Sequence, residues 1–189
     1  MTLDTQHLNK NRQDLSQLDE IWLFGYGSLI YKVDFDYIRS ERAHIFGYER
    51  RFWQGSHDHR GTPEKPGRVL TLVESENTRC GGVAFQVSHD VFDHLDHREK
   101  NGYLRHEISL HLNSGKAVTG LVYTADADND AYLGEASIAE LAEQIYECSG
   151  PSGPNREYVY DLAAALRAHG EIDEHVFAIE RALRAMESA

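Results

Sequence analysis

The order of the apolar runs along the chain limits the fold more than any other feature of the sequence. Runs with the aromatic and β-branched residues typical of strands occupy 21–26, 43–53, 68–73, 82–87, 103–112 and 117–123. One helical pattern, 88–98, interrupts them, with Val91, Phe92 and Leu95 on one face. Helical patterns then fill the C-terminal third. Strands followed by helices, rather than strands alternating with helices, predict an α+β fold.

Three helices are expected in the C-terminal third. Ser137 and Glu140 have the spacing of a capping box at the start of the first helix. A loop rich in Gly and Pro separates it from the second helix, which we expect Asn155 to cap. Asp173 begins the third helix, whose buried face is expected to include Met186.

The length and composition fit one globular domain preceded by a short arm. The 189 residues are 41% hydrophobic and 26% charged, which excludes a fully disordered chain. No apolar stretch approaches the roughly 20 residues of a membrane-spanning helix. Residues 1–20 are polar and have neither a sustained helical pattern nor the apolar segment of a secretory signal. We therefore expect a loosely held arm over 1–20 and a single domain over 21–189, located in the cytoplasm.

The charge of the chain argues against two classes of partner. A net charge of −12 opposes general binding to nucleic acid or to an anionic membrane. The stretch 39–68, however, contains seven Arg and Lys residues and four Asp and Glu residues. This stretch either attracts an anionic small substrate or is an ordinary solvated surface, and the pattern leaves both readings open.

The cysteines and histidines do not form a recognisable metal motif. The two cysteines, Cys80 and Cys148, cannot complete a four-thiolate zinc site, and we expect both to be buried thiols. Two pairs of histidines are close in sequence, namely His57 with His59 and His94 with His97. Neither pair has the HExxH or HxxEH pattern, so we expect no metal site.

A glycine-containing turn follows the first predicted strand. Residues 25–29, Gly-Tyr-Gly-Ser-Leu, come directly after it. Two glycines permit positive φ angles, so that successive amides converge on an anion, but a plain glycine turn is the alternative. The turn is not a dinucleotide-binding fingerprint, because Ile30 stands at the third glycine position. The residues beside Ser28 also differ from those of a nucleophile elbow.

Glu99 is the strongest candidate for an acid and base. It follows the predicted helix 88–98, at the end where the helix dipole disfavours a carboxylate. A desolvated carboxyl group in that position would have a raised pKa and would be able to accept and return a proton. The alternative is a surface glutamate that pairs with Arg98 or Lys100.

Six sequence blocks closely resemble, in the same order, those of the ChaC family of γ-glutamylcyclotransferases. The blocks are WLFGYGSLI at 22–30, RRFWQGS at 50–56, DHRGT at 58–62, PGRV at 66–69, REKNGY at 98–103 and SGPSGPN with a following EY at 149–158. Together they extend the resemblance from residue 21 to about residue 184, so that only the arm lies outside it.

The resemblance implies a small mixed β-barrel of about six strands, flanked by helices, that cleaves glutathione into 5-oxoproline and cysteinylglycine without a cofactor. It implies that Glu99 is the catalytic carboxylate. It also implies these substrate-binding residues: Phe24, Gly25, Tyr26, Gly27, Ser28, Leu29 and Tyr158. In this reaction the substrate's own α-amine attacks the γ-carbonyl, so the protein needs no nucleophile of its own. Glu99 would carry the proton from that amine to the leaving nitrogen.

Two alternatives of function and one of assembly stay open. The chain could act on other γ-glutamyl peptides or amines, or it could be a non-enzymatic regulator of cation transport. We expect a monomer, with a weak dimer as the alternative.

Overall fold

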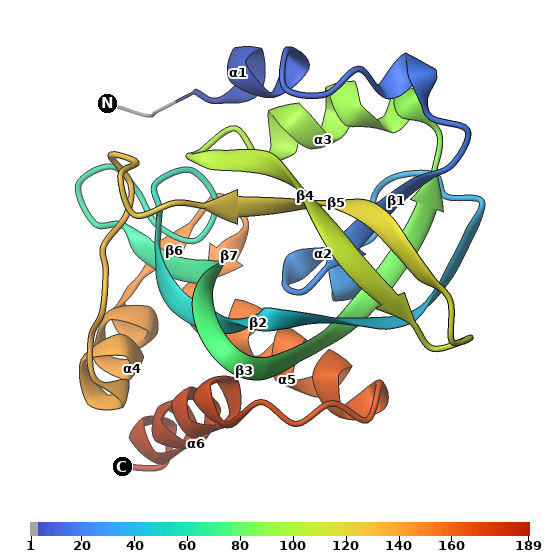
Figure 1. The fold of residues 1–189 in the computed structure, drawn as a ribbon. Helices are drawn as coiled ribbons and strands as arrows, with labels where there is room; N and C mark the ends of the chain where they lie inside the picture. Colours follow the sequence, from blue (N-terminus) through green and yellow to red (C-terminus); the bar gives the residue numbers. More distant parts are fainter. Residues whose placement is uncertain (1–3) are drawn as a thin grey trace.

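The computed structural model describes residues 4–189, which form a closed β-barrel with helices on two sides (Figure 1). The helices are α1 (Gln6–Lys10), α2 (Ser28–Tyr31), α3 (Phe92–Arg98), α4 (Ile138–Glu147), α5 (Asn155–Ala168) and α6 (Glu174–Glu187), with short 3-10 turns at Leu15–Gln17 and His89–Val91. The strands are β1 (Ile21–Gly25), β2 (Arg39–Ser56), β3 (Gly67–Val87), β4 (Tyr103–Leu112) and β5 (Ala117–Ala125), with a two-residue pair, β6 (Ser149–Gly150) and β7 (Gly153–Pro154).

The barrel contains both antiparallel and parallel pairs of strands. Its order is β1–β3–β2–β4–β5, and neighbouring strands are antiparallel except at the closure. There β1 pairs with β5 in parallel, with Leu23 opposite Leu121. The mixed barrel of an α+β fold is therefore confirmed.

The barrel has five strands rather than the expected six. The runs 68–73 and 82–87 are the two ends of β3, and both ends pair with β2. The polar residues 74–79 resemble a loop in sequence, but they are the largely exposed middle of a long strand. The pairing is irregular there, opposite Gly47 of β2, which has a positive φ of 82°. Residues 74–79 are polar because they are largely exposed, and their polarity does not mark the end of the strand.

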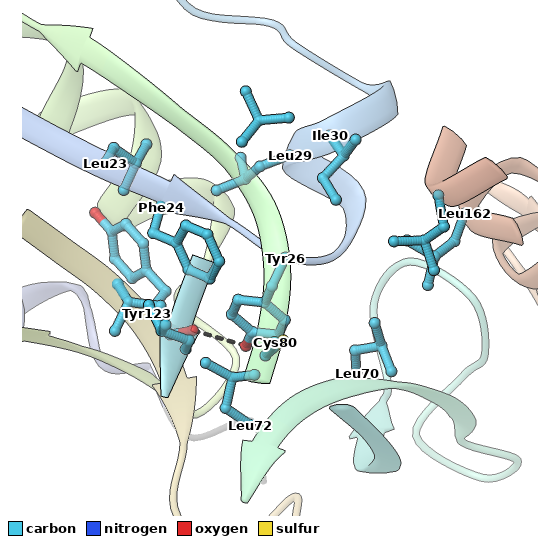
Figure 2. Packing of buried hydrophobic residues seen from close by; sticks show 14 of the residues in the cluster. Leu23, Phe24, Tyr26, Leu29, Ile30, Leu70, Leu72, Cys80, Tyr123 and Leu162 are labelled. Carbon is cyan, nitrogen blue, oxygen red and sulfur yellow. Dashed lines mark hydrogen bonds between the residues drawn. The ribbon is translucent and has the colours of Figure 1, made fainter. Parts of the chain in front are cut away.

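The core fills the barrel and continues under the C-terminal helices. Every residue of β1 is buried, as expected for a strand that is covered on both faces. Figure 2 shows this packing around Phe24, with Leu162 contributed from the C-terminal helices. The helices α4, α5 and α6 contact one another, α6 also contacts β2, and α4 and α5 contact β3 (Figure 1).

The expected helix starts are confirmed at two of three places. Ser137 and Glu140 form the capping box of α4, and the side chain of Asp173 accepts from the N–H of Val176 at the start of α6. Asn155 does not cap α5. Its buried side chain instead accepts from the N–H of Arg68 and donates to the carbonyl of Arg68. Met186 is 36% exposed, so it does not belong to the buried face of α6. No helix in the described part of the chain has both the length and the apolar character that a membrane crossing demands.

Part of the N-terminal segment 4–20 is packed against the domain, although most of its residues are exposed. The helix α1 contacts α3 and β4, and Thr5 and Asn9 are almost completely buried (Figure 1). Their side chains are bonded to the main chain of residues 100–105. A pattern of apolar residues cannot reveal this packing, because polar side chains provide it.

Candidate active site

The turn between β1 and α2 is held in place by buried side chains. The Nε of Arg50 donates to the carbonyl of Tyr26 at 2.6 Å, and its Nη1 pairs with Asp173 at 3.1 Å. The hydroxyl of Tyr26 donates to the carbonyl of Tyr123 at 2.7 Å (Figure 2). Residues 25–29 are therefore anchored both to α6 and to the barrel strand β5.

The glycines of this turn provide space rather than a left-handed backbone. Neither Gly25 nor Gly27 has a positive φ, so the expected use of that conformation is wrong. A Cβ atom on Gly27 would lie 3.0 Å from the hydroxyl of Tyr158 and 3.5 Å from Cδ1 of Leu70. A Cβ atom on Gly25 would lie 3.1 Å from that of Leu29. A side chain at either position would thus require its neighbours to shift by a few tenths of an ångström.

Glu99 lies directly after α3, and its side chain is only 15% exposed. Burial raises the pKa of this carboxyl group. Its Oε1 is 3.5 Å from the Nε of Arg98, and the positive charge of Arg98 lowers the pKa of Glu99. The negative charges of Asp34 and Asp58 raise this pKa further. Glu99 is therefore not the solvated surface residue of the alternative interpretation, although it does lie beside Arg98. This environment therefore raises the pKa of Glu99 above that of an exposed glutamate and favours its protonated form.

Arg98 connects the end of α3 to α2. Its Nη2 donates to the hydroxyl of Ser28 at 3.0 Å, and its Nη1 donates to the carbonyl of Lys32 at 2.8 Å and to the carboxylate of Asp34. Arg98 also approaches Glu99, so these contacts place its guanidinium between the turn 25–29 and the carboxyl group of Glu99. Sequence reasoning treated Arg98 only as a surface partner and missed this role.

Tyr158 is brought to the same place by α5. It is 7% exposed, and its ring packs edge-on against those of Tyr31 and Phe52, with ring centroids 5.8 Å away in each case. Burial, and then the charge of Glu99, raises the pKa of Tyr158 to about 12. Its hydroxyl therefore keeps its proton at neutral pH and can donate a hydrogen bond.

These residues line two adjoining hollows. The outer hollow has a volume of about 270 Å³, close to the lower end of the range for small-molecule sites. An inner hollow of about 30 Å³ continues toward the turn. The residues that line both are Ser28, Glu99, Tyr103 and Tyr158, and the inner hollow adds Phe24, Tyr26, Gly27 and Leu29. The structure thus brings together all the predicted site residues except Gly25, which lines neither hollow.

Three further polar residues of the outer hollow were not predicted individually. Arg60 is 9% exposed and is the only Arg or Lys of the described stretch 39–68 that lines the hollow. Asp58 and Asn101 also line it, and each has a buried Oδ1 atom without a hydrogen-bond partner in the described residues. The blocks DHRGT and REKNGY were the only sequence signals for these positions.

The histidines near the hollow do not form a cluster of metal ligands. Within residues 4–189, no three His, Cys, Asp or Glu side chains lie together as a metal ion would require. His94 lines the outer hollow but contacts Asp34, with 3.3 Å between Nε2 and Oδ1. Cys80 and Cys148 are buried free thiols, as expected.

Comparisons with known proteins agree with one another. Residues 21–186 match the family model described as ChaC-like protein. Glutathione-specific γ-glutamylcyclotransferase 1 of Danio rerio is 44% identical over 175 residues, which cover 87% of this chain and 89% of that protein. γ-Glutamylcyclotransferase 2-3 of Arabidopsis thaliana is 42% identical over 168 residues, covering 82% and 84%. A yeast γ-glutamylcyclotransferase specific to glutathione, known from its crystal structure, has a TM-score of 0.80 at 29% identity, covering 89% of this chain and 99% of that one.

Proposed function

Since the chain belongs to the ChaC-like family, we propose that it is a γ-glutamylcyclotransferase that cleaves glutathione into 5-oxoproline and cysteinylglycine. The single observation that carries this proposal is the position of Glu99. A buried carboxyl group with a raised pKa lies in a hollow of small-molecule size, beside the turn 25–29. The names of the relatives in fish and yeast support glutathione as the substrate.

The reaction needs little beyond positioning and one proton carrier. The α-amine of the substrate attacks the γ-carbonyl carbon, a C–N bond forms within a five-membered lactam, and the bond to the cysteinyl nitrogen breaks. Because nucleophile and electrophile belong to one molecule, correct orientation supplies a large part of the rate. Glu99 takes a proton from the α-ammonium and returns it to the departing nitrogen, so the carboxylate is regenerated. The second proton that the attacking nitrogen loses as it becomes the lactam N–H is balanced by protonation of the released amine to an ammonium group.

The turn and Tyr158 are assigned to the negatively charged parts of the reacting group. Residues 27–29 line the inner hollow, and we assign their main-chain N–H groups to the α-carboxylate. The hydroxyl of Tyr158, which is protonated at neutral pH, would donate to the oxyanion that develops on the γ-carbonyl. The polar side chains of Asp58 and Asn101, which line the outer hollow, are assigned to the α-ammonium.

Arg60 is assigned to the other end of the substrate. Its guanidinium is held at the wall of the outer hollow by a bond from Nη1 to the carbonyl of Pro154 at 3.0 Å. Glu157, 3.5 Å away, is 56% exposed and can move into solvent. A glycyl carboxylate would then take its place beside the guanidinium.

We also assign the enzyme to the cytoplasm, as a monomer. The two unpaired thiols fit a reducing compartment. A net charge of −12 opposes self-association.

Replacement of Glu99 by glutamine tests the proposal directly. We would incubate wild-type protein and Glu99→Gln with millimolar reduced glutathione and measure both products by mass spectrometry. The variant keeps the shape of the side chain but cannot accept the proton, so turnover should fall by about 10²–10⁴-fold. Glu107→Gln, at an exposed position of β4, is the matched control and should keep full activity.

The other outcomes are equally informative. Activity above about 1% in Glu99→Gln would remove Glu99 from the role of base. A folded wild-type protein without products would redirect the assay to other γ-glutamyl peptides and amines. Failure with these as well would favour a non-enzymatic regulator.

A further inference from the structure

The loop that contains Glu99 is bonded to the N-terminal segment of the chain. We call residues 4–20 the N-terminal strap and residues 99–102 the Glu99 loop. The main-chain N–H of Thr5 donates to the carbonyl of Lys100 at 2.9 Å. The hydroxyl of Thr5 lies 3.0 Å from the same carbonyl and 2.7 Å from that of Tyr103. Asp4 forms a β-bridge with Asn101, so the strap contacts the loop at consecutive residues.

The strap continues along the beginning of β4. The side-chain amide of Asn9 donates to the carbonyl of Tyr103 at 3.0 Å and accepts from the N–H of Arg105 at 2.9 Å. The side chain of Asn9 thus provides the donor and the acceptor that a neighbouring strand would otherwise provide. Further along, Arg12 and Gln13 donate to the carbonyl of Arg105 at 2.6 and 3.2 Å.

The topology explains why β4 needs these contacts. One edge of β4 pairs with β5 over 103–111, but the other edge pairs with β2 only at 111–112. Near the Glu99 loop, the second edge has no neighbouring strand among the described residues, and the strap provides its hydrogen-bond partners. Thr5 and Asn9 are 1% and 0% exposed. Water therefore cannot replace these partners, and loss of one leaves buried main-chain groups unsatisfied.

The position of Glu99 depends on the same bonds. Glu99 is held on one side by the bond from its N–H to the carbonyl of Leu95 at 2.9 Å. On the other side the next fixed point is the carbonyl of Lys100, which accepts from the N–H of Thr5 and from the N–H of Gly102, where the chain turns with a φ of 89°. A displacement of about 1 Å at a reacting group can cost about 100-fold in rate.

We propose that the N-terminal strap positions the Glu99 loop for proton transfer, with Thr5 as the positioning residue. This inference rests on the proposed function of Glu99. The match to the family model begins at residue 21, so the strap lies outside it. The competing explanation is that the strap only stabilises the open edge of β4.

Three variants separate these explanations. Thr5→Val removes the hydroxyl and preserves the shape of the side chain and its N–H bond to Lys100. Thr5→Ser keeps the hydroxyl, and Gln13→Ala removes a strap bond to Arg105, farther from Glu99. We expect kcat of Thr5→Val to fall about 10-fold or more, with KM changed by less than about twofold, because a positioning defect affects the chemical step rather than ground-state binding. Thr5→Ser and Gln13→Ala should keep the wild-type kcat.

Amide hydrogen exchange decides the question independently of activity. In Thr5→Val, exchange at the amides of 99–102 should be faster than in the wild type, while that of β5 should be unchanged. A lower Tm of Thr5→Val with unchanged kcat, or unchanged exchange at 99–102, would overturn the positioning role. If the wild-type protein does not cleave glutathione, the proposed function fails, and the exchange measurement alone decides whether the strap orders the loop.

Discussion

Two buried carboxyl groups on or beside α3 have different surroundings. Asp96 is 2% exposed and accepts from the hydroxyl of Tyr123 at 2.6 Å, with Arg105 at 3.5 Å. Its Oδ1 is thus in contact with two partners within the protein. Glu99 lies at the wall of the hollows and has Arg98 at 3.5 Å. Burial raises the pKa of both groups, but only Glu99 is placed to exchange a proton with a ligand.

The raised pKa of Glu99 predicts a cost to stability that depends on pH. A carboxyl group whose pKa is higher in the folded state stabilises the fold below its unfolded pKa, and this contribution is lost as the pH rises through the folded pKa. Glu99→Gln should therefore raise the free energy of unfolding relative to wild type at neutral pH. The gain should vanish below the ordinary glutamate pKa of 4.5.

Urea unfolding at several pH values measures this difference, with Glu107→Gln as the exposed control. A gain that does not change with pH would show that ionisation of Glu99 is not its cause. A loss of stability at neutral pH would contradict the prediction outright.

At the scale of elements, the site is assembled from places where elements begin and end. The turn before α2, the end of α3 and the first turn of α5 meet at the hollows. The approach of α5 is close, since a Cβ atom on Gly27 would lie only 3.0 Å from the hydroxyl of Tyr158. The position of α5 therefore determines the shape of the inner hollow.

Substitution of Gly27 tests this contact. Gly27→Val places branched carbon atoms where the hydroxyl of Tyr158 and Leu70 already lie, so the inner hollow should close to the α-carboxylate. We expect KM for glutathione to rise by about 10-fold or more, as measured by steady-state kinetics. In the smaller variant Gly27→Ala, the added substitution Tyr158→Phe should relieve the crowding and lower KM, although kcat should fall because the hydroxyl assigned to the oxyanion is lost. Normal kinetics in Gly27→Val would mean that the turn has only a structural role.

At the scale of the whole molecule, charge predicts the assembly. The net charge of −12 causes repulsion between two molecules and so favours the monomer. The protein should therefore sediment as a species of 21.5 kDa. Analytical ultracentrifugation over a range of protein concentrations checks this expectation. A mass that rises toward twice this value with concentration would instead identify the weak dimer.

Much of the fold was predicted from local patterns. The strand runs 103–112 and 117–123 match β4 and β5 closely, and the helix starts at Ser137 and Asp173 are confirmed. These signals are local, because the side-chain periodicity of an element and the capping of a helix involve residues only a few positions apart. The polar middle of β3 was misleading locally, because the runs on either side of it belong to one strand that pairs with the distant strand β2.

The sequence by itself determined the fold class and, through the ordered motifs, the family and the candidate acid Glu99. Only the tertiary structure decided how the site is built: Tyr158 against Gly27, Arg98 against Ser28, and the N-terminal strap against the Glu99 loop. The partners in these pairs are about 70 to 130 positions apart in the chain, so no local pattern relates them. Their approach results from barrel closure and helix packing, which also bury Glu99 and thereby raise its pKa.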